Sequence, residues 1–221
     1  MHNKAERLRK SRSPKADPLL GGRLPPGQVL TERFPILHEG EVPEYDLATW
    51  SLRLFGGLSR AVELSYADLQ ALPQRTLTCA IHCVTRWSKF DTQWRGVHLS
   101  DVFQALGIQP GTGFVMAHAD PDYQTNLRLE DLMHPDSLLA LTYAGQPLTP
   151  QHGWPLRLVV AGRYFWKSAK WLRGLEFTEH EQAGFWENNG FHLHADPFLE
   201  QRFSGEALDI PEDEWQRKRF D

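Results

Sequence analysis

The stretch 77-LTCAIHCVTRWSKFD-91 contains the only two cysteines of the 221-residue chain, Cys79 and Cys83. Together with the two residues before it, the stretch predicts a strand over 75–83 that ends at Cys83. A basic segment with Arg86 and Lys89 comes directly after the second cysteine. The pattern is compatible with a redox pair, a metal site, a nucleophile or a buried strand followed by a basic turn.

Four interpretations of Cys83 are open on these residues. A buried structural thiol is common, because unpaired cysteine is among the most buried residue types. A disulfide to Cys79 is disfavoured, because residues four apart on a strand lie about 13 Å from each other. A zinc site needs further ligands at matching spacing, and His82 faces the other side of the strand. A nucleophilic or metal-bound thiolate is favoured by Arg86 and Lys89, because nearby cations stabilise the thiolate.

A second candidate is the basic and aromatic stretch 151-QHGWPLRLVVAGRYFWKSAKWLRGLEF-177. Its five cations and three tryptophans are Arg157, Arg163, Lys167, Lys170, Arg173, Trp154, Trp166 and Trp171. A solvated strand-turn-strand would explain the charges. The turn 166-WKSAKW-171 could instead hold a phosphate with ammonium groups, a hydroxyl and backbone N–H groups. Single-stranded nucleic-acid binding is a third possibility.

Two further stretches place polar residues where they could reach a site. In 34-FPILHEGEVPEYD-46, His38 lies between an apolar run and an acidic segment. The stretch 118-HADPDYQTNLRL-129 follows a predicted buried strand and reads as a polar loop, which often carries functional residues. Neither stretch by itself indicates which reaction is catalysed.

Composition and motifs exclude several classes of protein. The net charge of −4 gives no overall attraction to nucleic acid, and no run of 18 apolar residues predicts a membrane-spanning helix. Phosphate-binding and dinucleotide-binding glycine motifs are missing. We see no secretory signal, and two cysteines make no disulfide framework. These features predict a cytoplasmic protein.

The pattern of elements predicts a mixed α+β fold. Residues 1–30 are basic and then rich in proline and glycine, which indicates a flexible arm ahead of one domain over 31–221. Within that domain, strands are predicted over 49–56, 75–83, 113–119, 155–162 and 171–180, and helices over 64–72 and 98–108. Ser65 and Ser100 are the expected helix N-caps. Strands and helices do not alternate regularly, which disfavours a doubly wound parallel sheet.

Taken together, four segments resemble the molybdopterin-binding oxidoreductase domain of the sulfite oxidase family. They are HCVTRWSKFDTQWRGV, DYQTNLRLEDLMHP, YAGQPLTPQHGWPLRLVVAGRYFWKSAKWL and GFWENNGFH, in this order. The resemblance covers roughly residues 31–195 and includes small sulfite-oxidase-like proteins and the catalytic subunit of bacterial methionine sulfoxide reductase. It implies a molybdenum–molybdopterin cofactor and two-electron oxygen-atom transfer on a small substrate, which could be a sulfoxide, an N-oxide or a sulfite-like anion.

The resemblance also implies roles for individual residues. The family's molybdenum-binding thiolate matches Cys83 and not Cys79. A soft thiolate suits a metal already held by sulfur. The family's pterin contacts fall on Leu37, His38 and His152. Its phosphate contacts fall on Arg157 and on the turn Lys167, Ser168, Ala169 and Lys170. Substrate-side candidates are Arg86, Tyr123 and Asp122.

Members that oxidise sulfite follow their cysteine with paired arginines, whereas this chain has the single Arg86 in Val84-Thr85-Arg86-Trp87. An electron donor or acceptor is an expected but unidentified partner. The alternative function is a non-catalytic module that binds an anion or single-stranded nucleic acid through the Trp/Lys/Arg segment, with Cys83 merely buried.

Overall fold

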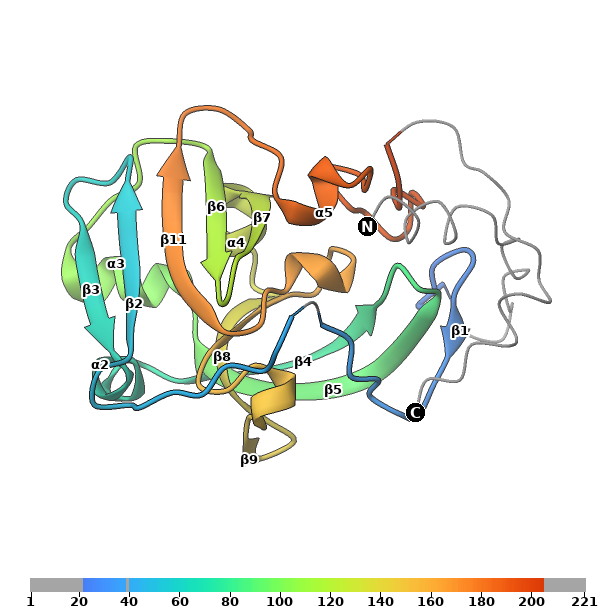
Figure 1. Cartoon of the computed structure of the whole chain (residues 1–221), viewed down its shortest axis with the longest axis horizontal. Helices are drawn as coiled ribbons and strands as arrows, with labels where there is room; N and C mark the ends of the chain where they lie inside the picture. The colour runs from blue at the N-terminus through green and yellow to red at the C-terminus, as the bar shows by residue number, and fades with distance from the viewer. Residues whose placement is uncertain (1–21, 39, 205–221) are drawn as a thin grey trace.

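The computed structural model describes residues 22–38 and 40–204. This part of the chain forms two β-sheets and several short helices (Figure 1). The five-stranded sheet has the order β3-β2-β11-β6-β7. The six-stranded sheet follows the path β1-β5-β8-β10, with β4 paired to β5 and β9 paired to β8.

The strands of the five-stranded sheet are β2 (Ser51–Gly56), β3 (Val62–Ser65), β6 (Phe114–Ala119), β7 (Tyr123–Arg128) and β11 (Leu172–Thr178). Those of the six-stranded sheet are β1 (Val29–Leu30), β4 (Arg75–His82), β5 (Trp87–Val97), β8 (Ser137–Tyr143), β9 (Gln146–Pro147) and β10 (Arg157–Val160). The helices are α2 (Tyr66–Ala71), α3 (Leu99–Leu106), α4 (Leu129–Met133), α5 (Phe185–Asn188) and the 3-10 turns η2 (Pro150–His152) and η3 (Phe165–Lys167).

Local sequence explains the helix ends. Helix α2 begins with the predicted capping box between Ser65 and Asp68. The predicted N-cap of α3, Ser100, is wrong: the cap is His98, whose ring accepts a hydrogen bond from the Ser100 backbone N–H. Helix α3 ends where Gly107 adopts a left-handed conformation with φ 62°.

Strand β5 begins four residues after Cys83, so Lys89 of the basic segment lies on a strand and not in a turn. It is an 11-residue strand paired to β1, β4 and β8. From Asp91 onward its residues alternate between exposed and buried, with Thr92 and Trp94 inside. In the sequence, the charged residues on the outer face obscured this alternation, so the strand was not predicted. The turn at Cys83 is therefore the end of a long hairpin.

Strand β7 corrects a second expectation, because 118–129 was predicted to be a polar loop. Thr125 and Asn126 are buried on this strand although both are polar. Their side chains hydrogen-bond to groups from other elements, Thr125 to Glu187 and Asn126 to Lys167. Polar residues were thus mistaken for exposed ones, because buried partners far along the chain satisfy them.

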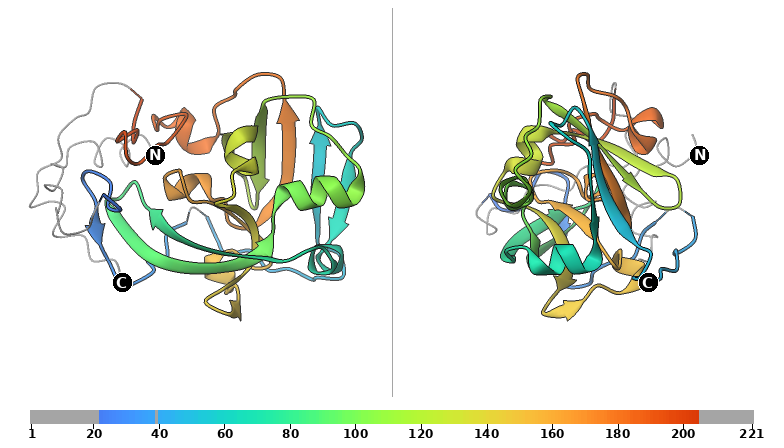
Figure 2. Two further views of the ribbon diagram at one scale, coloured as in Figure 1. Left: turned by 180° about the vertical axis from the view of Figure 1, so that it is seen from behind. Right: turned by 90° about the vertical axis from the view of Figure 1, so that its left-hand side faces the viewer.

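The architecture is mixed, but sheets dominate it, and α3, the longest helix in the described residues, has eight residues. Helices α3 and α4 cover one face of the five-stranded sheet (Figure 2). One buried cluster packs around that sheet. A second cluster includes Cys83, Trp87, Trp166 and Phe191. Within 22–38 and 40–204, no helix has the length and apolar character needed to cross a lipid bilayer.

Residues 22–30 run along the hairpin that carries Cys83. Val29 pairs with Trp87 and Leu30 with Ser88, in parallel register. The basic part of the predicted arm, residues 1–21, lies outside the described residues. The division into an arm over 1–30 and a domain over 31–221 stays a prediction.

Candidate active site

A cavity of about 170 Å³ lies where five segments of the chain meet. They are residues 34–38, the turn after β4, the connection from β6 to the start of β7, the segment from η2 to Trp171, and α5 with the residues that follow it. Most of its lining is apolar and aromatic, with a few polar groups. Such a lining is typical of a site that binds a small molecule or cofactor.

Cys83 lines this cavity at the end of β4. Its backbone N–H donates to the Trp87 carbonyl oxygen at 2.8 Å, which closes the hairpin turn. The Thr85 hydroxyl donates a hydrogen bond to the Cys83 sulfur at 3.1 Å, and Thr85 lines the cavity too. A hydroxyl donor next to sulfur favours the thiolate, which is the form that binds a metal.

Cys79 has a different environment, and no disulfide joins it to Cys83. Its sulfur lies 3.6 Å from the Thr92 hydroxyl oxygen, outside the cavity lining. Burial raises the pKa of the Cys79 thiol to about 11, so Cys79 stays protonated at neutral pH. Cys79 therefore packs beside Thr92, apart from the cavity.

His82 is buried on the face of β4 away from the cavity. Its Nδ1 lies 2.8 Å from the Ser88 hydroxyl oxygen, and burial lowers the pKa of His82 to about 4. The described residues contain no group of three or more His, Cys, Asp or Glu side chains that could hold a metal ion. The zinc interpretation of Cys83 therefore finds no further protein ligands in this part of the chain.

Arg157 and Lys170 place positive charge in the same cavity. The Arg157 guanidinium donates to the His152 and Ser168 carbonyl oxygens, both at 3.0 Å, and is 1% exposed. It forms no ion pair with a carboxylate of residues 22–38 or 40–204, and its Nε has no hydrogen-bond partner there. A buried cation without a counter-ion is costly, so this site favours an anion.

Lys170 adds a second cation to this end of the cavity. Its Nζ donates to the Gln151 carbonyl oxygen at 2.7 Å. Burial, reinforced by the charge of Arg157, lowers the pKa of Lys170 to about 7. Glycine at position 153 allows the backbone there to lie close to Arg157 and Lys170. Its φ is 106°, and an added Cβ atom would lie 3.0 Å from the Cβ atoms of both residues.

Ser168 and Ala169 lie between these cations at the predicted phosphate turn. The Ser168 hydroxyl oxygen accepts from the Val160 N–H at 2.9 Å, which leaves its O–H proton available as a donor. The backbone N–H groups of Ala169 and Lys170 donate to no acceptor in the described part of the chain. Two cations, a hydroxyl and two N–H groups therefore belong to residues that line one end of the cavity, and such groups are the usual partners of a phosphate.

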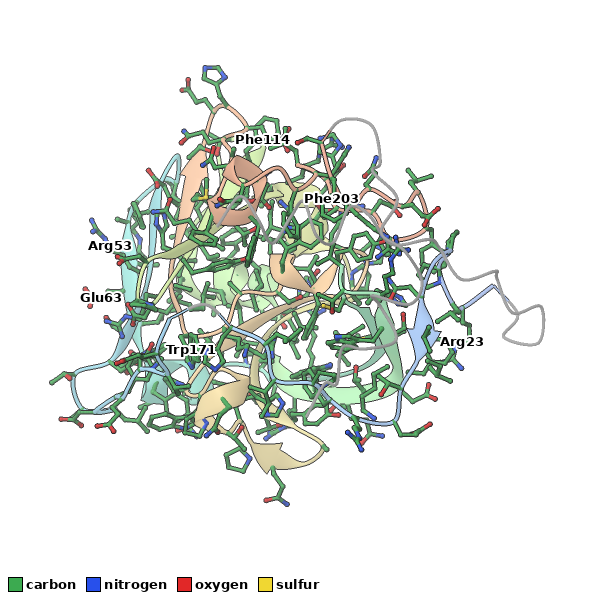
Figure 3. All side chains as sticks on the ribbon, turned by 45° about the vertical axis from the view of Figure 1, so that its right-hand side comes forward. Arg23, Arg53, Glu63, Phe114, Trp171 and Phe203 are labelled. Atoms are coloured by element: carbon green, nitrogen blue, oxygen red, sulfur yellow. The ribbon has the colours of Figure 1, made fainter. Side chains whose placement is uncertain are left out.

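The three predicted pterin contacts all line the cavity. Leu37 and His38 are exposed at its mouth, where the His38 ring lies 5.5 Å from the Trp171 ring. Trp171 lies beside the coil that contains them (Figure 3). The His152 ring is 4.4 Å from the Phe34 ring, and its Nε2 has no hydrogen-bond partner among the described residues.

Three other predicted site residues are not part of the cavity lining. Lys167 points into the protein, where its ammonium pairs with Glu187 at 2.6 Å and donates to Asn126. Arg86 is 5% exposed and already engaged with other groups. Asp122 is exposed to solvent outside the cavity. The structure thus assigns neither Lys167 to the phosphate turn nor Arg86 and Asp122 to the substrate side.

Tyr123 does line the cavity, but its hydroxyl donates to the Trp166 carbonyl oxygen at 2.6 Å. This bond links β7 to η3, so Tyr123 supports the wall of the cavity. The expected catalytic role of Tyr123 stays a prediction.

Sequence reasoning missed several residues of the lining. Thr85 lies two positions after Cys83, and its hydroxyl was not recognised as a partner of the sulfur. Asp120, which accepts from Tyr45 at 2.8 Å, contributes a carboxylate. Phe34, Trp186 and Phe191 contribute aromatic rings. The last two belong to GFWENNGFH, a segment that was noticed but not assigned a role.

The low pKa of Lys170 predicts pH-dependent anion binding. We expect cofactor-free protein to bind sulfate most tightly below pH 7, where Lys170 is protonated, and up to about tenfold more weakly for each pH unit above 7. Burial lowers the pKa of His152 as well. Calorimetric titration at pH 7, 7.5 and 8 measures the effect. Lys170→Arg stays charged and should bind sulfate equally at all three values; the same flat profile in the unchanged protein would contradict the prediction.

Comparison with known proteins agrees with this geometry. The family described as "Oxidoreductase molybdopterin binding domain" matches residues 39–186. The chain belongs to this family: it is a molybdopterin-binding oxidoreductase, and its cofactor is the molybdenum–molybdopterin group. The cavity fits that cofactor, with Cys83 available to the metal and the Arg157–Lys170 end available to the phosphate.

Individual relatives are consistent with the family. The chain is 46% identical over 184 residues to the uncharacterized oxidoreductase YuiH of Bacillus subtilis (strain 168), covering 83% of this chain and 93% of YuiH. It is 28% identical over 170 residues to the putative protein-methionine-sulfoxide reductase subunit YedZ1 of Azospira oryzae, covering 76% of this chain. It spans only 64% of the length of YedZ1.

The fold is shared with a solved structure, the sulfane dehydrogenase SoxCD from Paracoccus pantotrophus. The TM-score is 0.57 at 22% identity, over 63% of this chain and 40% of the SoxCD chain. The predicted sulfite-oxidase-type molybdopterin-binding fold is confirmed. The alternative of a non-catalytic binding module is not supported, because the family is one of oxidoreductases. Trp166 and Trp171 are also too buried, at 9% and 3% exposed, to stack nucleic-acid bases.

Proposed function

We propose that the chain catalyses two-electron oxygen-atom transfer on a small neutral substrate, with a sulfoxide or an N-oxide as the substrate class. The observation that carries this choice is the apolar environment of Cys83. Cys83 packs in one buried cluster with Val84, Trp166 and Phe191, all of which line the cavity. Aromatic walls suit an uncharged substrate that carries apolar substituents.

The position of Arg86 supports the same choice. A sulfite-like anion needs cationic donors close to the metal, and Arg86 was the residue expected to supply one. Arg86 is buried outside the cavity lining. The two cations that do line the cavity, Arg157 and Lys170, lie at the proposed phosphate end. A neutral substrate therefore fits the Cys83 side better than sulfite does.

The cofactor supplies the redox chemistry, and the protein binds and orients it. Cys83 is the proposed metal ligand, and the Thr85 hydroxyl orients its sulfur. Arg157, Ser168, Ala169 and Lys170 are the proposed phosphate ligands. Leu37, His38 and His152 are the proposed pterin contacts. Trp186 and Phe191 exclude water from the substrate side.

Sulfoxide reduction consumes two electrons and two protons and releases a thioether and water, so the protein needs an electron donor. The relative YedZ1 is described as a reductase subunit, which supports a separate electron partner here too. The cytoplasm is the proposed compartment, on the sequence argument alone.

A substrate screen tests the proposed class. Cofactor-loaded protein is supplied with a reduced viologen dye and methyl phenyl sulfoxide, trimethylamine N-oxide or nitrate. Sulfite oxidation is measured separately with an electron acceptor. We expect kcat/KM to be highest for the neutral substrates. Sulfite oxidation at a higher kcat/KM than any sulfoxide or N-oxide would refute the proposed substrate class.

Lys170→Ala tests the proposed phosphate end. We expect the variant to retain about tenfold less cofactor after gel filtration, because loss of a charge-assisted hydrogen bond weakens binding by about 1.5–3 kcal/mol. Molybdenum and pterin per chain are the measured quantities. Lys89→Ala is a matched control, because Lys89 also donates to a backbone carbonyl oxygen, that of Glu32, but lies outside this cavity. Equal retention by Lys170→Ala and Lys89→Ala would place the phosphate elsewhere.

A further inference from the structure

Two segments that are remote in the sequence hydrogen-bond to the backbone of the turn that carries Cys83. The Gln28 side-chain amide donates to the Cys83 carbonyl oxygen at 3.0 Å. The Arg202 guanidinium donates to the Val84 carbonyl oxygen at 3.0 Å. The Val29 backbone N–H donates to the Arg86 carbonyl oxygen at 2.8 Å. Three of the four carbonyl groups in the turn 83–86 are therefore fixed by groups from outside the hairpin.

Gln28 is held at both ends of its amide group and is 3% exposed. Its Nε2 donates to Cys83, and its Oε1 accepts from the Ser88 hydroxyl at 3.3 Å. Ser88 in turn lies 2.8 Å from His82 Nδ1. This chain of contacts ties the start of β5 and the end of β4 to the same amide, so Gln28 sets the position of the turn between them.

Arg202 joins three segments at one buried guanidinium, which is 4% exposed. Besides Val84, it donates to the carbonyl oxygens of Pro26 at 3.0 Å and Gly27 at 3.3 Å. Its guanidinium lies over the Tyr164 ring, 4.8 Å from the centroid. Figure 1 shows β1 beside the β4–β5 turn. Arg202 thus locks residues 26–27 and the turn against each other.

We propose that Gln28 and Arg202 are positioning residues for the Cys83 sulfur, acting on the backbone of its turn; this rests on the proposed role of Cys83 as the metal ligand. The turn needs such support, because Arg86 adopts a left-handed conformation with φ 75°, which is unfavourable for a residue with a side chain. Metal ligands have to be held within about 0.5 Å of the productive geometry. The two remote segments supply that restraint, and neither Gln28 nor Arg202 lines the cavity.

The test uses one conservative change at each residue. Gln28→Glu keeps the size and the acceptor for Ser88 but removes the donor to Cys83. Arg202→Lys keeps the positive charge, but a single ammonium cannot reproduce the three carbonyl contacts. Arg23→Ala is the control: Arg23 lies on the same arm near β1 (Figure 3), where it makes an exposed ion pair with Asp91 at 2.7 Å and does not touch the turn.

Two measurements report on the position of the sulfur. In cofactor-loaded protein, we expect Gln28→Glu and Arg202→Lys to shift the thiolate-to-metal absorption band and to release cofactor about 10-fold to 100-fold faster. In cofactor-free protein, hydrogen exchange at the Arg86 N–H, which donates to the Cys83 carbonyl oxygen, should be at least about tenfold faster. Arg23→Ala should match the unchanged protein in both.

The outcomes distinguish the positioning role of Gln28 and Arg202 from the role of Cys83 as the metal ligand. A wild-type absorption band together with wild-type exchange in both variants would overturn the positioning role of Gln28 and Arg202. A protein that carries molybdenum whose absorption does not change on Cys83→Ser would overturn the proposed metal ligand itself. Faster exchange in Gln28→Glu at an unchanged melting temperature supports positioning over general stability.

Discussion

Replacing Cys83 by serine will lower oxygen-atom-transfer activity by more than about 100-fold, because losing a metal ligand costs more than losing a group that only orients one. Serine keeps the size of the side chain but replaces a soft, readily ionised sulfur by a hydroxyl that stays protonated. The thiolate-to-metal absorption band will disappear, and the Thr85 hydroxyl will lose its sulfur acceptor. Activity, molybdenum content and the visible spectrum are measured on the same preparation.

Cys79→Ser is the matched control. Cys79 lies four residues earlier on the same strand, its sulfur contacts the Thr92 hydroxyl, and it does not line the cavity. We expect full molybdenum content and activity within about twofold of the unchanged protein, because the substitution disturbs one weak contact. Equal losses from Cys79→Ser and Cys83→Ser would instead indicate that the two cysteines act together.

Replacing Glu187 by glutamine will destabilise the protein by about 3–5 kcal/mol, because it leaves the Lys167 ammonium buried without its counter-ion. The two side chains are 2.6 Å apart and each is 1% exposed. Glu187 also accepts from the Trp166 indole N–H at 2.8 Å. Glutamine keeps an acceptor for that donor, so the variant isolates the loss of charge. Urea unfolding followed by tryptophan fluorescence measures the change.

The double variant Lys167→Met/Glu187→Gln should recover most of the lost stability, because it removes both buried charges. Burial lowers the pKa of Lys167 from its usual 10.5 despite the nearby carboxylate. Without Glu187 that pKa falls further, and the unfolded chain then binds the extra proton. Stability of Glu187→Gln should therefore rise with pH relative to the unchanged protein. A double variant no more stable than Glu187→Gln would show that the loss does not come from the unpaired ammonium.

This ion pair connects two walls of the cavity. Lys167 directly precedes Ser168 at the proposed phosphate end, and Glu187 directly follows Trp186 on the aromatic side. Asn126 and Thr125 of β7 hydrogen-bond to Lys167 and Glu187, respectively. The polar residues of β7, which read as a loop in the sequence, therefore form the buried support between the two walls.

Sequence was sufficient for the features that depend on neighbouring residues or on a whole segment. The capping box at Ser65 and the strand that ends next to Cys83 needed only local spacing, and the family membership needed whole segments. The proposed anion-binding role of 166–171 also came from the sequence, because Ser168, Ala169 and Lys170 lie together in one turn. These are short-range properties, and the chain around them specifies them.

Tertiary structure alone decided which charged side chains face the cavity. Lys167 and Lys170 are three residues apart and chemically alike, yet Lys167 pairs with Glu187 whereas Lys170 lines the cavity. Arg86 is likewise buried away from the cavity, and Gln28 and Arg202 reach the turn from 55 and 118 residues away. The physical reason is that a buried charged group or amide needs a hydrogen-bonding or ionic partner beside it. These partners belong to elements that are distant in the sequence.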